Sequence, residues 1–404
     1  MAINKEQNKL NVPHLRFPEF HGEWCVSTIG EQFDLYSGNT PSRLNKEHFE
    51  GNVNWITSGE LKEHYISDTK EKISEDAATA NNLKLLHPGT FVIAIYGLEA
   101  DGVRGTGSIT CKESTISQAC MAFTQKGDVK NEFLYSWYKK HGNIIGIKYA
   151  QGTKQQNLSY DILEKFHIAY PSQDEQDKLI KFISLLDERI ASQSKLIEDL
   201  KKLKSAIIDY AINSLDTDFA KFGSLYEMAG EGGTPTTSNA SFYDNGNIPF
   251  IKIDDLKQKY LTENKDFITE LGLQKSSAWL VPTHSILFSN GATIGEISIT
   301  TYPVCTKQGI LGIVPKQNID VEFLYYFMSS SYFKKAVRRI VTEGTMKTAY
   351  LKDINNILCP IPTKEKQQEI AKMPSTLNSK IDFEQSILKL FCSQKQYLLR
   401  QMFI

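Results

Sequence analysis

The sequence predicts an α+β protein in which two similar mixed α/β globules are joined by two long helices that form an antiparallel coiled coil. Three observations lead to this fold class: an internal repeat with a period of about 190 residues, apolar strand-like runs within each copy, and a heptad pattern that closes each copy. Of the 404 residues, 41% are hydrophobic, which is enough apolar material for real cores. We therefore expect a pseudo-twofold arrangement within one chain.

The internal repeat consists of short matches that stay in order along the chain. A Gly-x-Thr-Pro turn begins at Gly38 and again at Gly232. The offset between the copies falls from 194 to 190 residues between Gly97 and Ser108, so the first copy has four extra residues there. Further matched pairs are Leu61 and Leu256, Glu132 and Glu322, Gly152 and Gly344, and Gln176 and Gln367.

Each copy has the same predicted order of elements. After the turn come apolar runs bounded by Pro, Gly or Asn, which predict strands such as Phe91–Ile95 and Ile286–Phe288. Short helices are expected around Glu132–Tyr138 and Glu322–Met328, followed by a Gly-Thr loop, a strand and a proline. The predicted segments are an N-terminal arm (1–20), a first globule (21–172), a central long helix (173–215), a second globule (216–362) and a C-terminal long helix (363–404).

The long helices carry a heptad seam with two polar interruptions each. Gln193 and Lys204 interrupt the first seam, and Glu384 and Lys395 stand at the same places after a shift of 191 residues. A parallel pair in register would place the two lysines side by side, whereas an antiparallel pair can place Lys204 opposite Glu384 and Gln193 opposite Lys395. This charge pattern predicts the antiparallel arrangement. The alternative is that each helix packs only on its own globule. Pro374 lacks an N–H and predicts a helix start or a kink.

The composition indicates the cellular compartment of the protein and the kinds of partner it can have. A net charge of −1 gives no support by itself to a nucleic-acid partner. Six scattered cysteines without a CxxC favour a reducing cytoplasm and argue against a zinc site. No run of about 18 apolar residues is available for a transmembrane helix, and the first residues lack the apolar stretch of a secretory signal. We therefore expect a cytoplasmic protein without a membrane partner.

The duplicated order of motifs resembles the specificity subunit (HsdS) of type I restriction-modification enzymes. The segment from Pro13 to Phe20, the two Gly-x-Thr-Pro turns and the Pro-x-x-x-x-Gln stretch that opens each long helix carry the resemblance, which covers nearly the whole chain. It implies that each globule is a target recognition domain for one part of an asymmetric bipartite DNA target. It also implies that the long helices dock two adenine-N6 methyltransferase subunits, which recruit two motor–nuclease subunits. The chain itself would be non-catalytic and without a cofactor, with S-adenosylmethionine, ATP and Mg²⁺ on the partner subunits.

Catalytic motifs are weak or missing in the sequence. The Asp/Asn-Pro-Pro-Tyr/Phe motif of adenine methyltransferases does not occur, and Gly102–Gly107 has the wrong order for a dinucleotide-binding loop. Glu60-Leu-Lys62 and Asp255-Leu-Lys257 resemble half of a nuclease site, but no upstream acid accompanies them. The histidines have no metal-ligand spacing, so no metal is expected. A non-DNA scaffold with two protein-binding heads remains the alternative function.

Candidate DNA-binding residues are chosen by loop position and chemistry. Arginine in the longer loop can contact a guanine edge or a phosphate, and the polar Gly-Thr loops and a basic helical face can contact phosphates. Ordinary solvated turns and surface charges are the alternatives. The candidates are Arg104, Thr153, Lys154, Gln155, Thr345, Lys347, Lys334 and Arg338, with Lys139 and Lys140 as the first copy's basic pair.

Two further predictions concern other surfaces. Lys195 and Lys202 on the first long helix are candidates for partner binding, because the seam leaves the outward residues of that helix unused. Trp55 and its counterpart Phe250 are interpreted as core residues rather than as stacking platforms for bases.

Overall fold

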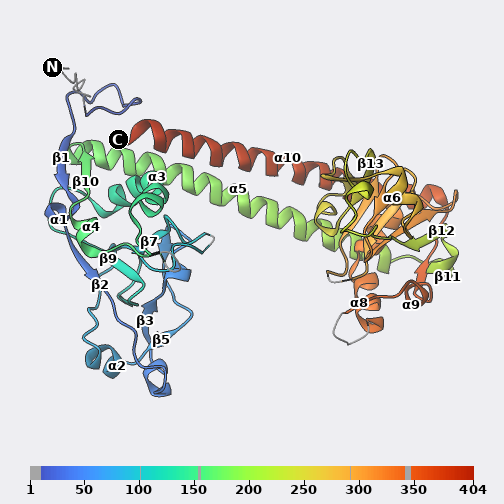
Figure 1. The fold of residues 1–404 in the computed structure, drawn as a ribbon, viewed down its shortest axis with the longest axis horizontal. Coiled ribbons are helices and arrows are strands. Elements are labelled where there is room, and N and C mark those ends of the chain that lie inside the picture. The colour runs from blue at the N-terminus through green and yellow to red at the C-terminus, as the bar shows by residue number, and fades with distance from the viewer. Residues whose placement is uncertain (1–10, 101, 153–155, 292, 342–346) are drawn as a thin grey trace. The chain divides into compact units, whose positions relative to one another are not determined.

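The chain divides into two compact units. The computed structural model describes residues 11–404 except 101, 153–155, 292 and 342–346. One unit contains the residues up to Gln193 together with Ile387–Ile404, and the other contains Ser194–Ser386 (Figure 1). Each unit therefore consists of one globule and parts of both long helices.

The described residues of the first globule form three sheets and four α-helices. The five-stranded sheet has the order β2 (Phe33–Ser37), β9 (Cys120–Gln125), β6 (Phe91–Ala94), β7 (Gly107–Thr110), β4 (Tyr65–Ile66). The three-stranded sheet has the order β5 (Lys72–Ile73), β3 (Val53–Ile56), β8 (Ser114–Ile116), and β1 (Cys25–Thr28) pairs with β10 (His167–Tyr170). The helices are α1 (Ile29–Gln32), α2 (Glu75–Ala80), α3 (Asn131–Tyr149) and α4 (Tyr160–Glu164).

The second unit repeats this topology strand for strand. Its five-stranded sheet has the order β12 (Tyr226–Glu231), β19 (Ile310–Pro315), β16 (Ile286–Ser289), β17 (Ile297–Thr300), β14 (Tyr260–Leu261). The smaller sheets are β15 (Asp266–Ile268), β13 (Ile248–Ile251), β18 (Cys305–Thr306) and the pair β11 (Phe219–Lys221) with β20 (Leu358–Pro360). The helices are α6 (Glu270–Gln274), α7 (Val321–Ser329), α8 (Ser331–Ile340) and α9 (Leu351–Ile354). Parallel and antiparallel neighbours also match, so the predicted internal repeat is confirmed.

Aromatic side chains fill the core between the five-stranded sheet and the helix that follows it. In the first unit, Phe91 of β6 packs against Phe123 of β9 at 5.5 Å and against Tyr138 of α3 at 5.7 Å between ring centroids. In the second unit, Phe333 of α8 packs against Phe288 of β16 at 6.1 Å. Burying each such ring stabilises the fold by about 1.5–3 kcal/mol. Trp55 and Phe250 are also buried, as the sequence predicts.

The repeated Gly-x-Thr-Pro turn follows from close backbone contact. A Cβ on Gly38 would lie 1.8 Å from the carbonyl oxygen of Ile116, and a Cβ on Gly232 would lie 2.2 Å from that of Thr306. Ile116 and Thr306 end the equivalent strands β8 and β18. Only glycine fits at both positions, which explains why the turn recurs in both copies.

The helix after β9 and its counterpart after β19 differ between the units. The helix predicted at Glu132–Tyr138 continues to Tyr149 as α3, whereas its counterpart is divided into α7 and α8 at Ser330. Ser330 has an extended backbone, and its hydroxyl accepts a hydrogen bond from the N–H of Phe333 at 3.2 Å. The carboxylate of Asp209 accepts from the N–H of Ser331 at 2.7 Å. These two caps start α8 as a separate helix.

A buried glutamine holds the start of each long helix, α5 (Gln173–Asn213) and α10 (Lys364–Met402). The side-chain oxygen of Gln176 accepts from the N–H of Lys130 at 2.9 Å, and its amide donates to the carbonyl of Pro171 at 3.0 Å. Gln367 makes the equivalent contacts with the backbone of Asp320, Asn318 and Pro362. The amide thereby satisfies backbone groups that end the globule's last strand and begin its helix. This role explains the repeated Pro-x-x-x-x-Gln stretch.

The two long helices pack antiparallel within each unit, as predicted. In the first unit, Lys395 of α10 forms an ion pair with Asp187 of α5, while in the second unit the Nζ of Lys204 donates to Asn378 at 2.9 Å. Every seam position from 183 to 211 and from 374 to 402 that the heptad pattern assigns is buried or half-buried. Pro374 lies inside α10, so it does not mark the helix start.

The register predicted for the helix pair is wrong. Lys204 contacts a residue six positions before Glu384, and Lys395 contacts one six positions before Gln193. Glu384 is compensated within α10 by Lys380, at 2.5 Å and one turn away. Opposite charges do meet across the pair, but between Lys395 and Asp187 and not at Glu384, whose carboxylate already has a cation on its own helix.

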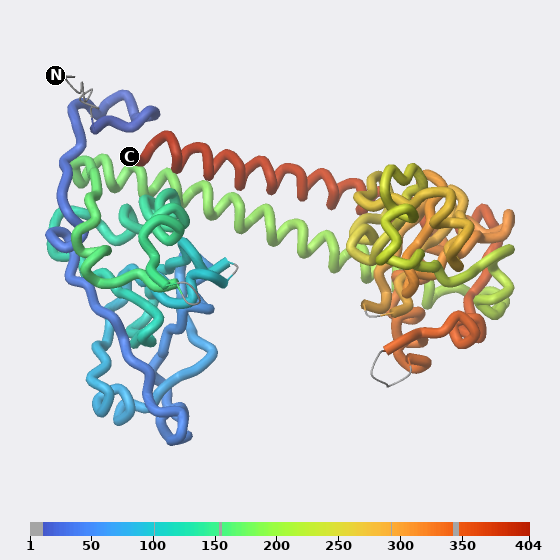
Figure 2. Tube along the Cα trace, in the orientation of Figure 1, coloured from blue at the N-terminus to red at the C-terminus, as the bar shows by residue number. Residues whose placement is uncertain are grey.

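The N-terminal arm packs on the first unit. Arg16 binds the buried carboxylate of Glu175 in two hydrogen bonds of 2.8 and 2.7 Å. The N–H of Leu15 donates to the carbonyl of Gln401 at 2.9 Å, and Phe17 packs edge-on against Phe182 of α5. Figure 2 shows this segment beside the last turns of α10. None of the described helices is long and apolar enough to cross a membrane.

Candidate nucleic-acid interface

A basic face on α8 lies above a buried apolar face of the same helix. Phe333 and Val337 point into the core of the second unit, and Lys334 and Arg338 are exposed beside them. The spacing of four residues places Lys334 and Arg338 next to each other on one side of the helix. The cap at Ser330 sets where this helix starts, and therefore which side its cations occupy.

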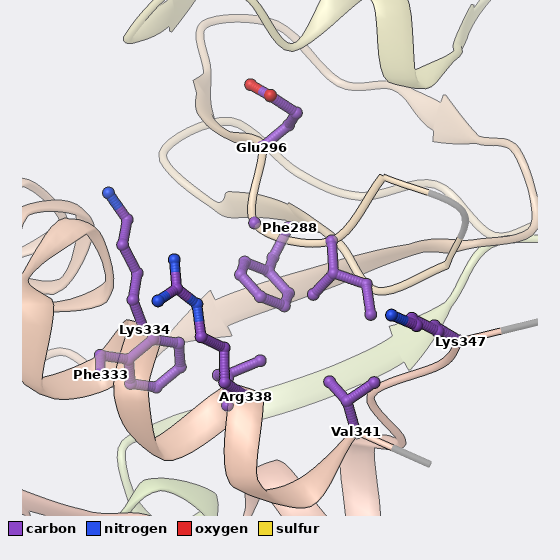
Figure 3. Close-up of a pocket in the computed structure, with 10 residues that line it drawn as sticks. Phe288, Glu296, Phe333, Lys334, Arg338, Val341 and Lys347 are labelled. Atoms are coloured by element: carbon purple, nitrogen blue, oxygen red, sulfur yellow. The ribbon is translucent and has the colours of Figure 1, made fainter. Parts of the chain in front are cut away.

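The basic face borders a cavity of about 470 Å³ (Figure 3). Phe288 lies between Arg338 and Lys347, with Lys334 and Arg338 extending from α8 and Lys347 approaching from the other side. The lining residues are Phe288, Ile294, Gly295, Glu296, Phe333, Lys334, Val337, Arg338, Val341 and Lys347. The structure thus brings together three of the basic residues that the sequence singled out. Thr345 lies outside the described residues.

Arg104 occupies a different environment in the first unit. It is half-buried, and its guanidinium donates to the side-chain oxygen of Gln156 at 2.7 Å. The loop that carries it rests on α3, where a Cβ on Gly146 would lie 2.4 Å from the Cγ of Arg104. The N–H of Gln156 in turn donates to Glu99 at 2.8 Å. Arg104 is therefore held beside the polar loop that the sequence proposed for phosphate contact. Thr153, Lys154 and Gln155 of that loop lie outside the described residues.

The basic pair of the first copy is engaged inside its own unit. Lys140 donates to the carbonyl of Phe403 at 2.6 Å. Lys139 lies over the ring of Tyr135 at 5.1 Å, and burial together with the nearby charge of Lys395 lowers the pKa of Lys139 to about 8. The indole of Trp137 donates to the carbonyl oxygen of Ile404 at 3.1 Å. These contacts direct the pair toward the end of α10, so it has no free face like that of α8.

Lys195 and Lys202 are exposed on α5, as their proposed role in partner binding requires. Lys195 lies 3.7 Å from Asp199, and Lys202 lies 2.5 Å from Glu198. Such exposed pairs one turn apart contribute little to stability. The side chains therefore remain available to an incoming surface.

A charged cluster that the sequence did not predict joins the first globule to the helix pair. His64 lies 2.8 Å from Glu132 of α3 and 3.6 Å from Asp187 of α5, and Asp187 is paired with Lys395. The imidazole is stacked on Tyr135 at 3.9 Å. Burial opposes the charged form of His64, but hydrogen bonds to Asp187 and Glu132 outweigh it and raise its pKa. Residues from four distant parts of the chain meet here.

The second unit has the same cluster with a lysine in place of the histidine. Lys259, whose side chain is 2% exposed, lies 2.9 Å from Glu322 and donates to the hydroxyl of Ser375 in α10 at 3.0 Å. The rings of Tyr260 and Tyr326 lie 4.7 and 4.8 Å from its ammonium group. The signal for this cluster was present in the repeat, because Glu132 matches Glu322 and the offset of 195 that relates Leu61 to Leu256 also relates His64 to Lys259.

The nuclease-like triplets have structural roles. The carboxylate of Glu60 accepts from the N–H of Thr57 at 2.9 Å and from the N–H of Lys70 at 2.7 Å. Asp255 accepts from the N–H of Lys252 at 2.8 Å. Both acids therefore cap short 3₁₀ helices, at Ser58–Glu60 and Ile253–Asp255. In the described part of the chain, no group of three or more His, Cys, Asp or Glu side chains is placed to hold a metal ion.

The family model and the relatives that match this chain all describe type I restriction enzyme specificity proteins. A family model described as type I restriction modification DNA specificity domain matches residues 21–202 and again residues 216–390. The specificity subunit of the type I restriction enzyme MjaIX from Methanocaldococcus jannaschii is 24% identical over 89% of this chain and 88% of its own length. The specificity subunit of EcoR124I/EcoR124II from Escherichia coli is 25% identical over 60% of this chain and 62% of its own length.

Two solved structures share the fold. The S subunit of a type I restriction-modification system from M. genitalium superimposes with a TM-score of 0.55 and 19% identity, covering 97% of this chain and 99% of that one. A chain from a study of complex assembly and conformational transition in the type I R-M system gives a TM-score of 0.61 with 14% identity, covering 93% and 96%.

Proposed function

Because the chain belongs to the type I restriction-modification DNA specificity family, we propose that it reads an asymmetric bipartite DNA target for such a complex. One observation carries this proposal: the two units share a framework but differ in the loops and charges that the framework presents. Arg104 is held over α3 in the first unit, whereas α8 presents an open basic face in the second. Unlike side chains on equivalent frameworks favour unlike half-sites, because base discrimination depends on the few side chains that reach the groove edges.

The same proposal assigns the remaining parts of the complex to partners. Two methyltransferase subunits would dock on the long helices at exposed positions such as Lys195 and Lys202, and two motor–nuclease subunits would join them. The chain itself would be non-catalytic. The carboxylates of Glu60 and Asp255 support this assignment because both are used in capping. S-adenosylmethionine, ATP and Mg²⁺ would then bind to the partners.

The decisive experiment is DNA binding by the chain together with its methyltransferase partner. We expect affinity for long duplex DNA that falls steeply with salt, because phosphate contacts release counterions. Mapping of methyl-adenine in DNA modified by the complex should then give two unlike parts separated by an unread spacer. A complex that assembles but has no affinity for duplex DNA would support the protein-binding scaffold instead.

A further inference from the structure

The cavity beside α8 is lined by three cationic side chains, which are hydrogen-bond donors, and by apolar side chains that form its walls. Phe288 and Phe333 are 2% and 0% exposed, so their rings form walls and present no free face for stacking. Lys334, Arg338 and Lys347 are exposed, and the structure assigns them no ion pair among the described residues. Lysine and arginine side chains donate and do not accept hydrogen bonds. The three cations therefore suit a ligand that is anionic and rich in acceptors.

The equivalent place in the first unit is closed by the protein itself. Lys334 and Arg338 lie 192 positions after Gly142 and Gly146, the same offset that relates Gly152 to Gly344. A Cβ on Gly142 would lie 3.0 Å from the Cα of Gly105, so the longer loop rests directly on these glycines. The loop that follows β16 is shorter in sequence, and its described residues Ile294, Gly295 and Glu296 line a cavity next to α8.

We propose that this cavity seats a backbone phosphate of the DNA duplex and anchors the second unit to DNA of any sequence. Among the described residues of the first unit, the corresponding surface is covered by the unit's own loop, where Gly105 lies against Gly142. The inference rests on the proposed function and adds to it an unequal division of labour between the units. A phosphodiester supplies the acceptor oxygens that three donors require, whereas base edges in either groove present donors as well as acceptors. The single carboxylate in the lining, Glu296, points away from Arg338 (Figure 3).

The test is a salt titration of DNA affinity with the full chain in its methyltransferase complex. The variant Lys334→Gln/Arg338→Gln removes two charges at exposed positions and should leave folding intact. We expect affinity to fall about tenfold for target and non-target duplexes alike. The slope of log affinity against log salt should drop by about 1 for each phosphate that the variant no longer neutralises. Lys257→Gln is the matched control, since Lys257 is an exposed lysine of the same unit that does not line the cavity.

Each outcome separates this inference from the proposed function. If the wild-type complex has no salt-dependent affinity for duplex DNA, the proposed function fails as well. If the wild type binds but the double variant keeps its slope and affinity, only the phosphate seat is wrong. A loss restricted to the target sequence would show that the cavity reads bases and would overturn the inference. Micromolar binding of inorganic phosphate to the chain without DNA, measured by calorimetry, would identify a free anion as the ligand and would overturn it too.

Discussion

In both units the globule contacts the long helices through the same geometry but with different chemistry. Glu132 and Glu322 occupy equivalent positions at the start of α3 and α7. Each pairs with a cationic side chain that directly precedes the edge strand β4 or β14. That cation is His64 in the first unit and Lys259 in the second. Histidine changes its charge between pH 5 and 8, and lysine does so only when strongly perturbed. A shared framework can therefore hold its two globules with unequal sensitivity to pH.

The comparison also shows where the repeat tolerates change. Strand order, the glycine turn and the glutamine at each helix start are the same in both units. The turn needs glycine because a Cβ would clash with a strand carbonyl, and the glutamine amide satisfies backbone groups at the helix start. The loop over α3 differs in length, and α7 is divided from α8 at Ser330, where Ser330 and Asp209 cap the new helix.

The largest expected effect follows from exchanging the longer loop. Replacing residues 97–107 by the shorter segment of the second copy removes Arg104 and the cover over Gly146. We expect recognition of one part of the DNA target to change or disappear, while the other part stays intact, as read from the positions of methyl-adenine. Equal changes in both parts, or a methylated motif that is a perfect palindrome, would contradict two independent reading units.

Next in size is the effect of removing the shared glutamate. Glu322→Gln leaves the ammonium group of Lys259 buried without a counter-charge, so we expect the second unit to lose about 3 kcal/mol of stability. Glu132→Gln should cost the first unit less, because His64 can release its proton. Denaturant unfolding combined with hydrogen exchange resolved by unit measures both. Equal losses would show that histidine and lysine are interchangeable in this cluster.

A smaller effect is expected from pH. The pKa of His64 is raised above its ordinary value in the folded chain, so its stabilising contribution is complete at pH values below the unfolded pKa and is lost as pH rises through the folded one. The groups that face it are Glu132, Asp187, Tyr65 and Tyr135, with Lys139 and Lys395 beside them. The first unit should lose stability relative to the second between about pH 6 and pH 8. His64→Gln should remove this difference, and a slope that persists in the variant would exclude His64 as its source.

The smallest effect on stability is expected at the exposed pairs of α5. Lys195→Glu/Lys202→Glu should change the stability of the second unit by less than about 0.5 kcal/mol, because solvent screens these pairs. The same variant should weaken assembly with the methyltransferase subunits, measured by size-exclusion chromatography at low concentration. Lys257→Glu, a reversal at an exposed position that is not part of the long helices, is its control. Normal assembly of the helix variant would remove these lysines from the docking surface.

Much of the fold could be predicted because the same motifs occur in the same order in both copies of the internal repeat. Gly38 and Gly232, or Gln176 and Gln367, mark equivalent backbone contacts, and together with the apolar runs they define the order of elements in both units. The basic face of α8 could also be predicted, since Lys334 and Arg338 are one turn apart on a helix. The ends of the helices were harder to predict from the sequence. The helix α3 continues past Tyr138 to Tyr149, whereas its counterpart is interrupted at Ser330.

The remaining features depend on contacts between distant residues. His64, Glu132, Asp187 and Lys395 are far apart in the sequence, and no local pattern indicates that they meet. The hydrogen bond between Arg104 and Gln156 depends on how one loop lies over α3. The register of the long helices could not be read from the polar seam positions, because Lys380 lies beside Glu384 on the same helix and Lys395 pairs with Asp187, which is not a seam position.

The cysteines of the two units differ in their accessibility to thiol reagents. Cys25, Cys111 and Cys392 are exposed and belong to the first unit, whereas Cys305 and Cys359 of the second unit are buried. Burial raises the pKa of Cys305 to about 11, which suppresses the reactive thiolate as long as the fold is closed. A maleimide pulse followed by peptide mass spectrometry would therefore modify the first unit in the native protein and the second only when it opens. The rate at which Cys305 and Cys359 are modified would thus report how often the second unit opens, without any engineered probe.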